Sequence, residues 1–383
     1  MFDDFMDEDE FAGDEGEGSY VAAETSLSPP NANTEILGHA AIEKQLLDLF
    51  NEGKLPHAMI FAGPMGVGKA TMAFRLARFL LKHGQNDEQG GLFGDAPAAP
   101  TSLNVSADDP VAHRVASGGH PDLRYFERPL APSGIKKTVF DVETVRKIAP
   151  FLRMSSSEGG WRVVIADEAD LMNKEAQNAI LKILEEPPPQ SLLILVCDRL
   201  GAMIPTIRSR CRTFMFQALD PQSMTSLLKR AAPHASSGEI KTLTELSDGS
   251  IGRALELHEE ESVKTLGTIL AFLSEWPDWR WSGIHILADS LSRKEAARAY
   301  AGFTHIMEWV AQSFARAKAV NDQNLSEALK TAELTALKNH YSLGQWIEIC
   351  EKLNAHFTAV ERSNLDERQG VIGAFAIFGG QSI

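Results

Sequence analysis

Short hydrophobic runs alternate with helical patterns over the first half of the chain. Each run is bounded by polar or turn-forming residues, and most of the runs are continuously apolar. Such runs are typical of strands that are buried on both faces of a sheet. Between them, apolar residues recur three and four positions apart, which is the spacing of a helix. The alternation predicts an α/β fold with a doubly wound, parallel, five-stranded sheet at residues 58–62, 123–126, 161–166, 192–196 and 213–216.

After Asp220 the pattern is helical throughout. Residues 220–258 form a short helical unit, and a longer helical region follows it. One helix of that region keeps a buried face at Phe303, Ile306, Met307, Val310 and Phe314. We therefore divide the chain into an N-terminal tail, an α/β domain, a small helical unit and an all-α C-terminal domain, at residues 1–33, 34–218, 219–260 and 261–383.

Two segments lack any periodic pattern. Residues 1–33 carry ten of the negative charges that give the chain its net charge of −15, and they end in Ser28-Pro29-Pro30. Such a composition cannot bury enough apolar surface to offset the entropy of ordering, so we expect a disordered tail that contributes nothing to stability. Residues 84–120 are rich in Gly, Ala, Pro and Asp and predict a long loop.

Composition narrows the class of protein further. The three cysteines, Cys197, Cys211 and Cys350, are far apart in the sequence and form no C-x-x-C pair. This argues against a disulfide framework or a cysteine zinc site, and it favours a cytoplasmic location. No run of eighteen apolar residues occurs, so we expect no membrane span.

The string GPMGVGKAT at residues 63–71 follows the first predicted strand and precedes a helical pattern. In that context its glycines let backbone N–H groups turn toward phosphates, and Lys69 reaches the outer phosphates. Ala70 stands where a Ser or Thr hydroxyl would hold magnesium, and Thr71 comes one residue too late. The sequence thus predicts an ATP site with impaired magnesium binding. Its expected contacts are Gly63, Pro64, Gly66, Val67, Gly68, Lys69 and Thr71.

Two carboxylates follow the third predicted strand. Asp167 and Glu168 end a hydrophobic run, and the carboxyl ends of parallel strands line the ligand crevice of such a sheet. Asp167 is therefore the candidate magnesium carboxylate, and Glu168 is the candidate catalytic residue that orients the attacking water. The alternative is an acidic helix start, since Asp and Glu favour helix N-termini.

A basic string, Ser209-Arg210-Cys211-Arg212, lies between the fourth and fifth predicted strands. Taken alone, an arginine at a sheet edge favours a surface ion pair. The sharper hypothesis is an arginine finger that is donated to the triphosphate of a neighbouring subunit.

Three strings together resemble AAA+ proteins of the clamp-loader type. They are GPMGVGKAT at 63–71, IADEADLMNKEAQNAILKILEEPP at 165–188 and IRSRCR at 207–212. Within that family, residues 36–258 are similar to the delta-prime subunits of the bacterial DNA polymerase III clamp loader. The resemblance implies a helical lid at 219–260 and an oligomerising collar at 261–383.

The resemblance also implies partners and site residues. The family's complexes contain delta and gamma/tau subunits and load a sliding clamp on primed DNA. Arg210 would enter the ATP site of a neighbouring gamma/tau subunit, and Arg253 would take the sensor position of the lid. Leu37, Gly38 and His39 would lie beside the adenine.

The chain departs from the catalytic members of that family in three respects. Ala70 replaces the magnesium hydroxyl, Cys197-Asp198 replaces a polar Thr sensor, and the cysteine-rich zinc module is missing. We therefore expect a structural subunit without polymerase activity, with little or no ATPase activity of its own and without zinc.

Two alternatives remain. A gamma/tau-like ATPase that hydrolyses ATP itself would call for a Ser or Thr after Lys69, four zinc cysteines and a long C-terminal extension. A P-loop kinase or GTPase does not explain the SRC string followed by an all-helical third.

Overall fold

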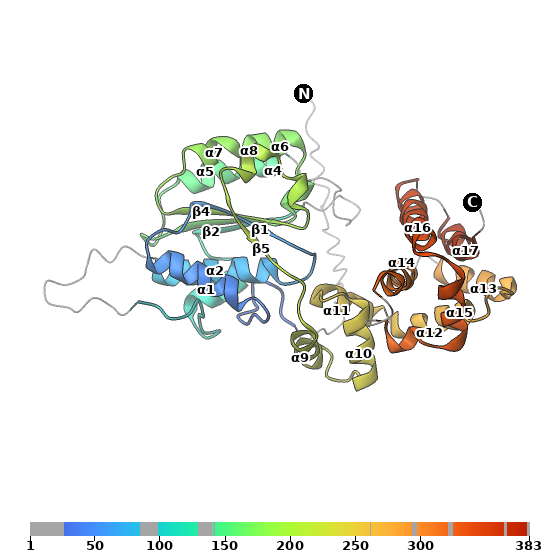
Figure 1. Cartoon of the computed structure of the whole chain (residues 1–383). Helices are drawn as coiled ribbons and strands as arrows, with labels where there is room; N and C mark the ends of the chain where they lie inside the picture. The colour runs from blue at the N-terminus through green and yellow to red at the C-terminus, as the bar shows by residue number, and fades with distance from the viewer. Residues whose placement is uncertain are drawn as a thin grey trace, which may run out of the picture.

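The computed structural model describes residues 27–84, 99–128, 140, 142–260, 262–292, 297–320, 325–363 and 366–380. These residues form a layered α/β part and an all-helical part, which lie beside each other in Figure 1. The chain passes from the first part to the second at residues 217–219, between the last strand and the first helix of the helical part.

All pairings in the sheet are parallel, and the strand order is β2-β3-β4-β1-β5. The predicted doubly wound, five-stranded sheet is confirmed. Every residue of the three central strands is buried, which is why their sequences are apolar without alternation. The strands are β1 (Ala58–Ala62), β2 (Leu123–Phe126), β3 (Arg162–Ala166), β4 (Ser191–Cys197) and β5 (Arg212–Met215).

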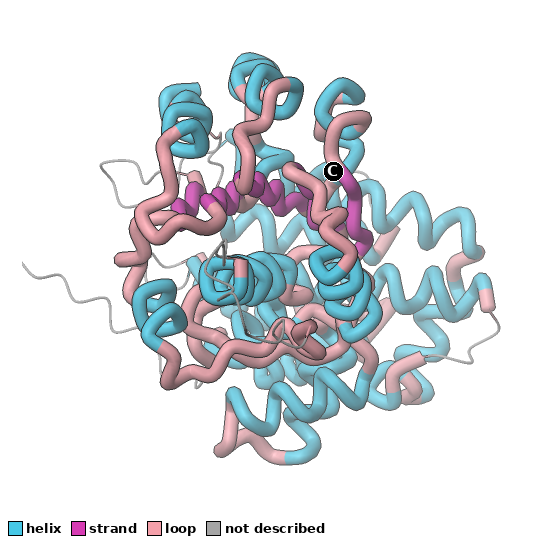
Figure 2. Tube along the Cα trace, turned by 90° about the vertical axis from the view of Figure 1, so that its left-hand side faces the viewer, coloured by secondary structure: helices cyan, strands magenta, loops and turns pink. Residues whose placement is uncertain are grey.

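Helices cover both faces of the sheet, as Figures 1 and 2 show. One core contains Met59 and Phe61 of β1, and the other contains their neighbours Ala58 and Ile60, because side chains alternate along a strand. The first face carries α1 (Ala40–Asn51), α2 (Lys69–His83) and α3 (Pro110–Ala116). The second carries α4 (Val142–Arg146), α5 (Ile148–Arg153), α6 (Lys174–Ala179), α7 (Leu181–Glu185) and α8 (Pro205–Arg208).

Helix α3 corrects the prediction of a continuous loop at residues 84–120. Its N-cap is Asp109, which accepts a hydrogen bond from the Val111 backbone N–H, and Pro110 is its first residue. This capping pattern stabilises a short helix even where apolar periodicity is weak. Residues 85–98 of the predicted loop lie outside the described residues.

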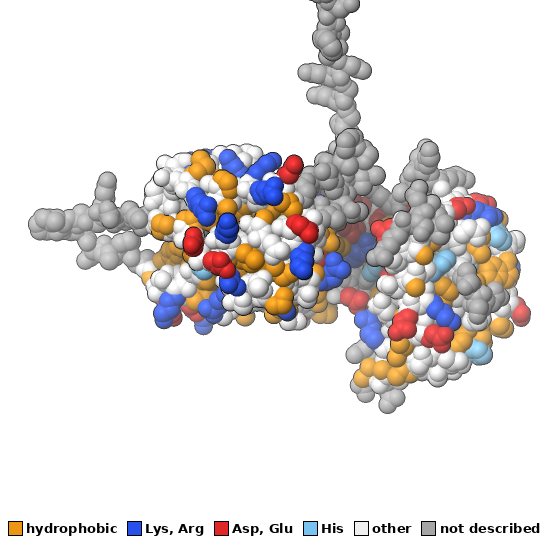
Figure 3. Space-filling view, turned by 90° about the horizontal axis from the view of Figure 1, so that it is seen from above, with side chains coloured by type: hydrophobic (Ala, Val, Ile, Leu, Met, Phe, Trp, Pro, Cys, Tyr) orange, Lys and Arg blue, Asp and Glu red, His pale blue; other side chains and the backbone are white. Residues whose placement is uncertain are grey.

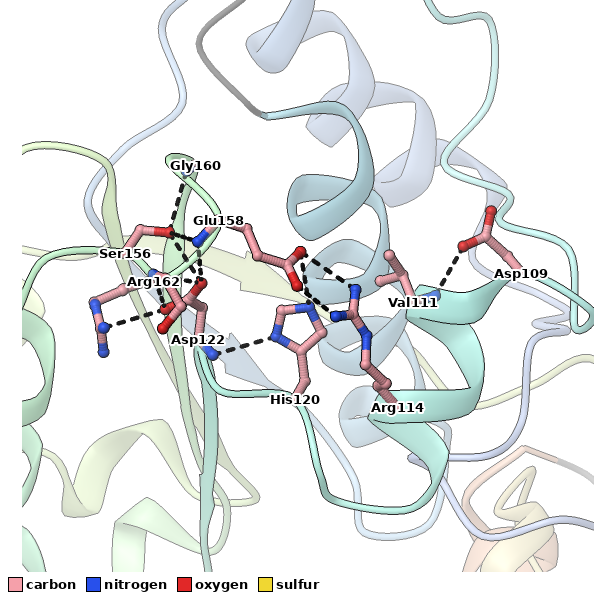
Figure 4. Close-up of polar contacts among 10 residues, drawn as sticks. Asp109, Val111, Arg114, His120, Asp122, Ser156, Glu158, Gly160 and Arg162 are labelled. Carbon is pink, nitrogen blue, oxygen red and sulfur yellow. Dashed lines mark hydrogen bonds and ion pairs between the residues drawn. The ribbon is translucent and has the colours of Figure 1, made fainter.

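A buried polar network then fixes the chain between α3 and β2, as Figure 4 shows. Asp122 is almost fully buried; it accepts hydrogen bonds from the Ser156 hydroxyl (2.9 Å) and pairs with Arg162 (3.2 Å). Arg114 of α3 pairs with Glu158 from the loop before β3. These contacts set the position of β2 and of the residues that follow it.

The helical part contains a single hydrophobic core that runs from Leu219 to Phe378. Two side chains of α14 reinforce it: His305 Nε2 lies 2.8 Å from the Leu246 carbonyl oxygen, and Trp309 donates to the Glu245 carbonyl at 3.1 Å. The helices are α9 (Pro221–Ala231), α10 (Ser237–Leu246), α11 (Ile251–Glu259), α12 (Ser262–Leu273), α13 (Trp281–Leu291), α14 (Ala297–Ala319), α15 (Ala332–His340), α16 (Leu343–Ser363) and α17 (Glu367–Phe378).

The predicted boundary between lid and collar falls inside this core. Apolar residues of α9–α11 and of α12–α17 belong to the same cluster, so α9–α11 pack as part of the larger helical body. The division at residue 260 stays a prediction about evolutionary units, since the packing itself is continuous.

Residues 27–33 do not follow the prediction of a disordered tail. The guanidinium of Arg78, on α2, is buried and donates to the carbonyls of Asn31 (2.9 Å) and Asn33 (2.5 Å). The Asn31 side chain in turn donates to the Ala116 carbonyl at 2.7 Å. These hydrogen bonds fasten the segment to the fold; residues 1–26 lie outside the described residues.

Deletion of residues 1–33 is therefore expected to lower the melting temperature by about 5 °C, and deletion of residues 1–26 to leave it unchanged. The longer deletion removes two acceptors of a buried guanidinium, a loss of roughly 1–3 kcal/mol at about 2–4 °C per kcal/mol. Thermal unfolding followed by circular dichroism measures both. Arg78→Met in the longer deletion should recover part of the loss; equal melting temperatures for the two deletions would contradict the role of Arg78.

Candidate functional site

The carboxyl ends of the parallel strands meet at one edge of the sheet. The loop after β1 begins there at Gly63, β3 ends at Asp167, and β4 ends next to Asp198. Beside this edge lies a cavity of about 380 Å³, a volume within the usual range of ligand pockets. Its lining brings together several predicted site residues with α11 and residues 27–33: Gly66, Gly68, Lys69, Ala70, Thr71, Asp167, Val196, Ile251, Gly252 and Leu255.

The glycine loop has a backbone that other residues would not adopt. Gly66 and Gly68 have φ angles of 72° and 102°. A Cβ on Gly66 would lie 2.4 Å from the Ser250 hydroxyl oxygen, so close packing against α11 also requires glycine there. The Gly252 N–H donates to the Gly66 carbonyl at 3.0 Å, which joins the helical part directly to the loop.

Lys69 points back into the loop. Its ammonium is buried and donates to the carbonyls of Gly63 (2.8 Å) and Pro64 (2.5 Å) and to the Asp198 carboxylate (2.7 Å). An ammonium has three protons, so these contacts use all of its donors. The sequence analysis predicted Lys69 but noted Asp198 only as a departure from a Thr sensor.

Asp167 faces the cavity, whereas Glu168 is not among the residues that line it. Asp167 accepts a hydrogen bond from the Tyr125 hydroxyl at 2.9 Å, and burial raises the pKa of its carboxyl. Glu168 has a φ of 52° and is held by Arg128 through two hydrogen bonds of 2.8 Å. A guanidinium that binds both oxygens neutralises the carboxylate and fixes its direction.

Tyr125 and Arg128 were missed by the sequence analysis. Tyr125 lies within β2 and Arg128 follows that strand, so both come about forty positions before their partners in the sequence. Neither belongs to a recognisable string. Only the pairing of β2 with β3 brings the two side chains to the carboxylates.

His39 supports the loop from below. Its Nε2 lies 2.7 Å from the Val67 carbonyl oxygen, its ring packs edge-on against Phe216, and burial lowers its pKa. Gly38 packs against Leu219, and Leu37 is partly exposed. None of these three lines the cavity, so their place beside the adenine stays a prediction.

Arg253 does not reach the cavity. Helix α11 presents Ile251, Gly252 and Leu255 to it, whereas Arg253 donates to Glu256 at 2.9 Å. Its charge acts on α14, where it opposes the rise that burial causes in the pKa of Glu308. Since neighbouring residues on a helix point about 100° apart, contact of Gly252 with the loop turns Arg253 away. The predicted sensor contact is therefore not made in this structure.

Arg210 lies at the opposite edge of the sheet. It precedes β5, whose first residue, Arg212, is level with Met59 in β1. Gly63 is four strand residues further on, or roughly 13 Å, so Arg210 cannot reach its own phosphate loop. Its side chain is partly exposed; it pairs with Glu185 at 2.8 Å and donates to the Thr206 carbonyl at 3.0 Å.

Among the described residues, no group of three His, Cys, Asp or Glu side chains is arranged to hold a metal ion. A magnesium ion bound with a nucleotide needs fewer protein ligands, because phosphates and water supply the remainder. Asp167 and Thr71 line the cavity and fit that smaller role. Within the same described ranges, no helix is long and apolar enough to cross a membrane.

A phosphate loop between β1 and α2, carboxylates after β3 and a helical unit resting on the loop define an AAA+ protein. Residues 38–220 match the family model described as "DNA polymerase III, delta subunit". Together with the relatives below, this match places the chain in the clamp-loader family of AAA+ proteins, among the delta-prime subunits of DNA polymerase III.

The DNA polymerase III subunit delta' of Pseudomonas aeruginosa is 33% identical over 205 residues, which are 53% of this chain and 56% of that protein. The delta' subunit of Bacillus subtilis is 27% identical over 195 residues, or 50% of this chain and 52% of that protein. The gamma/tau subunit of Mycobacterium tuberculosis is 31% identical over 206 residues, or 52% of this chain and 31% of that protein. The chain thus spans about half the length of the delta' relatives it matches.

Among solved structures, a gamma subunit-related protein from Thermotoga maritima covers 88% of this chain and 99% of its own at 15% identity. The TM-score of 0.41 is too low to support a conclusion.

Proposed function

We propose that this chain acts as the stator of a clamp-loader complex and donates Arg210 to the ATP site of a neighbouring gamma/tau subunit. The complex would load a sliding clamp on primed DNA at the expense of ATP. The position of Arg210 carries this proposal: a partly exposed guanidinium lies at the sheet edge opposite its own phosphate loop. Lys and Arg side chains are spread over the surrounding face of α4–α8, which Figure 3 views from above.

The chain's own loop would bind ATP weakly and would not hydrolyse it. Backbone N–H groups and Lys69 suit phosphates, and Asp167 and Thr71 could accompany a magnesium ion. Two features oppose turnover: Ala70 has no hydroxyl for the metal, and Glu168 is neutralised by Arg128.

A gamma/tau-like ATPase is the competing function, since gamma/tau relatives match this chain almost as well as delta' relatives do. Similarity alone does not separate the two. The engaged state of Glu168 favours the stator, because an ATPase requires a carboxylate that is free to orient water.

The assembly surfaces would include the C-terminal helices. Leu343 and Ile347 of α16 are exposed and four residues apart, so they share one face of that helix. Exposed apolar residues on one face favour burial against another subunit. We propose that this face joins the chain to delta or gamma/tau.

Ile347→Glu is expected to reduce assembly at least tenfold when the chain is mixed with delta and gamma/tau subunits. Size-exclusion chromatography with light scattering measures the complex. Glu348→Gln, which changes an exposed neighbour on the same helix, serves as the control and should assemble normally. If the wild-type chain formed no complex with these subunits, the clamp-loader role itself would have to be abandoned.

A further inference from the structure

Asp198 occupies the position from which a phosphate would be expected to pair with the loop lysine. Its Oδ1 lies 2.7 Å from Lys69 Nζ, and the lysine side chain is only 4% exposed. With two loop carbonyls already bound, the ammonium has no proton left for another acceptor. A phosphate can bind Lys69 only after one of these three contacts breaks.

The backbone of Asp198 is held in place by neighbouring groups. The Asp198 N–H donates to the buried carboxylate of Asp170 at 3.1 Å, and Arg199 donates to the other oxygen of Asp170 at 3.2 Å. On the loop side, the Gly63 N–H donates to the Cys197 carbonyl at 3.3 Å. The carboxylate therefore stands on a fixed turn at the end of β4, next to the loop.

A fixed carboxylate at this place opposes nucleotide binding in two ways. It competes with the phosphate for Lys69, and it stays near the incoming negative charge once the lysine has turned away. Asp198 is 41% exposed, so water screens part of this repulsion and the effect is moderate.

We propose that Asp198 is a built-in counter-ion of the phosphate loop, which lowers the affinity of this chain for nucleoside triphosphates and diphosphates. The proposal rests on the loop being the nucleotide site, but it is independent of the role of Arg210. It assigns weak nucleotide binding to a specific charge as well as to the missing hydroxyl at Ala70.

Asp198→Asn tests the proposal, because it removes the charge, keeps the shape and retains the backbone hydrogen bond to Asp170. The full chain is titrated with ADP and with the slowly hydrolysed analogue ATPγS, each with magnesium, by isothermal calorimetry. We expect the dissociation constant to fall about tenfold relative to wild type. Asp198→Glu, which keeps the charge, should stay near the wild-type value.

Two further variants locate the effect. Glu186→Gln changes the net charge equally but lies after α7, at the far edge of the sheet, and should not alter binding. Lys69→Ala added to Asp198→Asn should remove the gain if the nucleotide sits in the loop. Melting temperatures confirm that all variants are folded.

The possible failures are distinguishable. Equal affinities of wild type and Asp198→Asn, both abolished by Lys69→Ala, would leave the nucleotide site in place and overturn the counter-ion. No binding by Asp198→Asn at millimolar nucleotide would overturn both the counter-ion and the loop as a nucleotide site. Tighter binding by Glu186→Gln would reduce the effect to overall charge.

Discussion

Arg210→Ala is expected to lower clamp-stimulated ATP hydrolysis by the reconstituted complex several-fold, while the chain still folds and assembles. An arginine finger stabilises charge on the γ-phosphate in the transition state and contributes on the order of 10³–10⁵ in rate at a single site. The loss over the whole complex should be smaller, because the other ATP sites keep their own arginines. Steady-state phosphate release and clamp loading on primed DNA measure the effect.

Arg208→Ala is the matched control for Arg210. Arg208 is also exposed, lies two residues earlier and carries the same charge. Arg210→Lys should behave like the alanine variant, because a lysine lacks the planar fork that binds two oxygens. Lys69→Ala in this chain should be milder than Arg210→Ala. The reverse order of severity would show that the chain works as an ATPase in its own right.

The isolated chain is expected to turn over ATP more slowly than about 10⁻³ s⁻¹, the scale of P-loop proteins that lack an arginine finger. Restoring the hydroxyl with Ala70→Ser should strengthen magnesium-dependent binding without restoring hydrolysis. The reason is Glu168, whose two oxygens accept hydrogen bonds from Arg128. A phosphate-release assay with the purified chain measures the rate.

Adding Arg128→Ala to Ala70→Ser is the informative comparison. It frees Glu168, so any gain in hydrolysis should appear only in the double variant. Appreciable turnover by Ala70→Ser alone would mean that the Arg128 pair does not restrain Glu168. Appreciable turnover by the wild-type chain would contradict the stator role.

The strands could be predicted because burial on both faces leaves an apolar run that polar loops interrupt. Helix α3 could not, since its start depends on Asp109 and Pro110 and not on periodicity. Residues 27–33 were missed for a related reason. Their order comes from backbone carbonyls that bind Arg78, and a carbonyl acceptor is the same for every residue type.

The candidate site was predictable where one continuous string forms it, as at Gly66, Gly68 and Lys69. The ion pairs that modify the site were not. Lys69 and Asp198 are 129 positions apart, and Arg128 and Glu168 are 40 apart. Such pairs exist only after strands far apart in the sequence lie side by side. Arg253 failed on helical phase: a string can identify the helix but not which face it turns to the loop.

The shared core of α9–α17 makes the helical part a single lever. Its short end is Gly252, bonded to the phosphate loop, and its long end includes α16 and α17. The fulcrum is the connection at residues 217–219. A small displacement of the loop by a ligand, or by its loss, would swing the far helices through a larger arc, because packed helices do not deform individually. Strain applied to those helices by a neighbouring subunit would equally be felt at the loop.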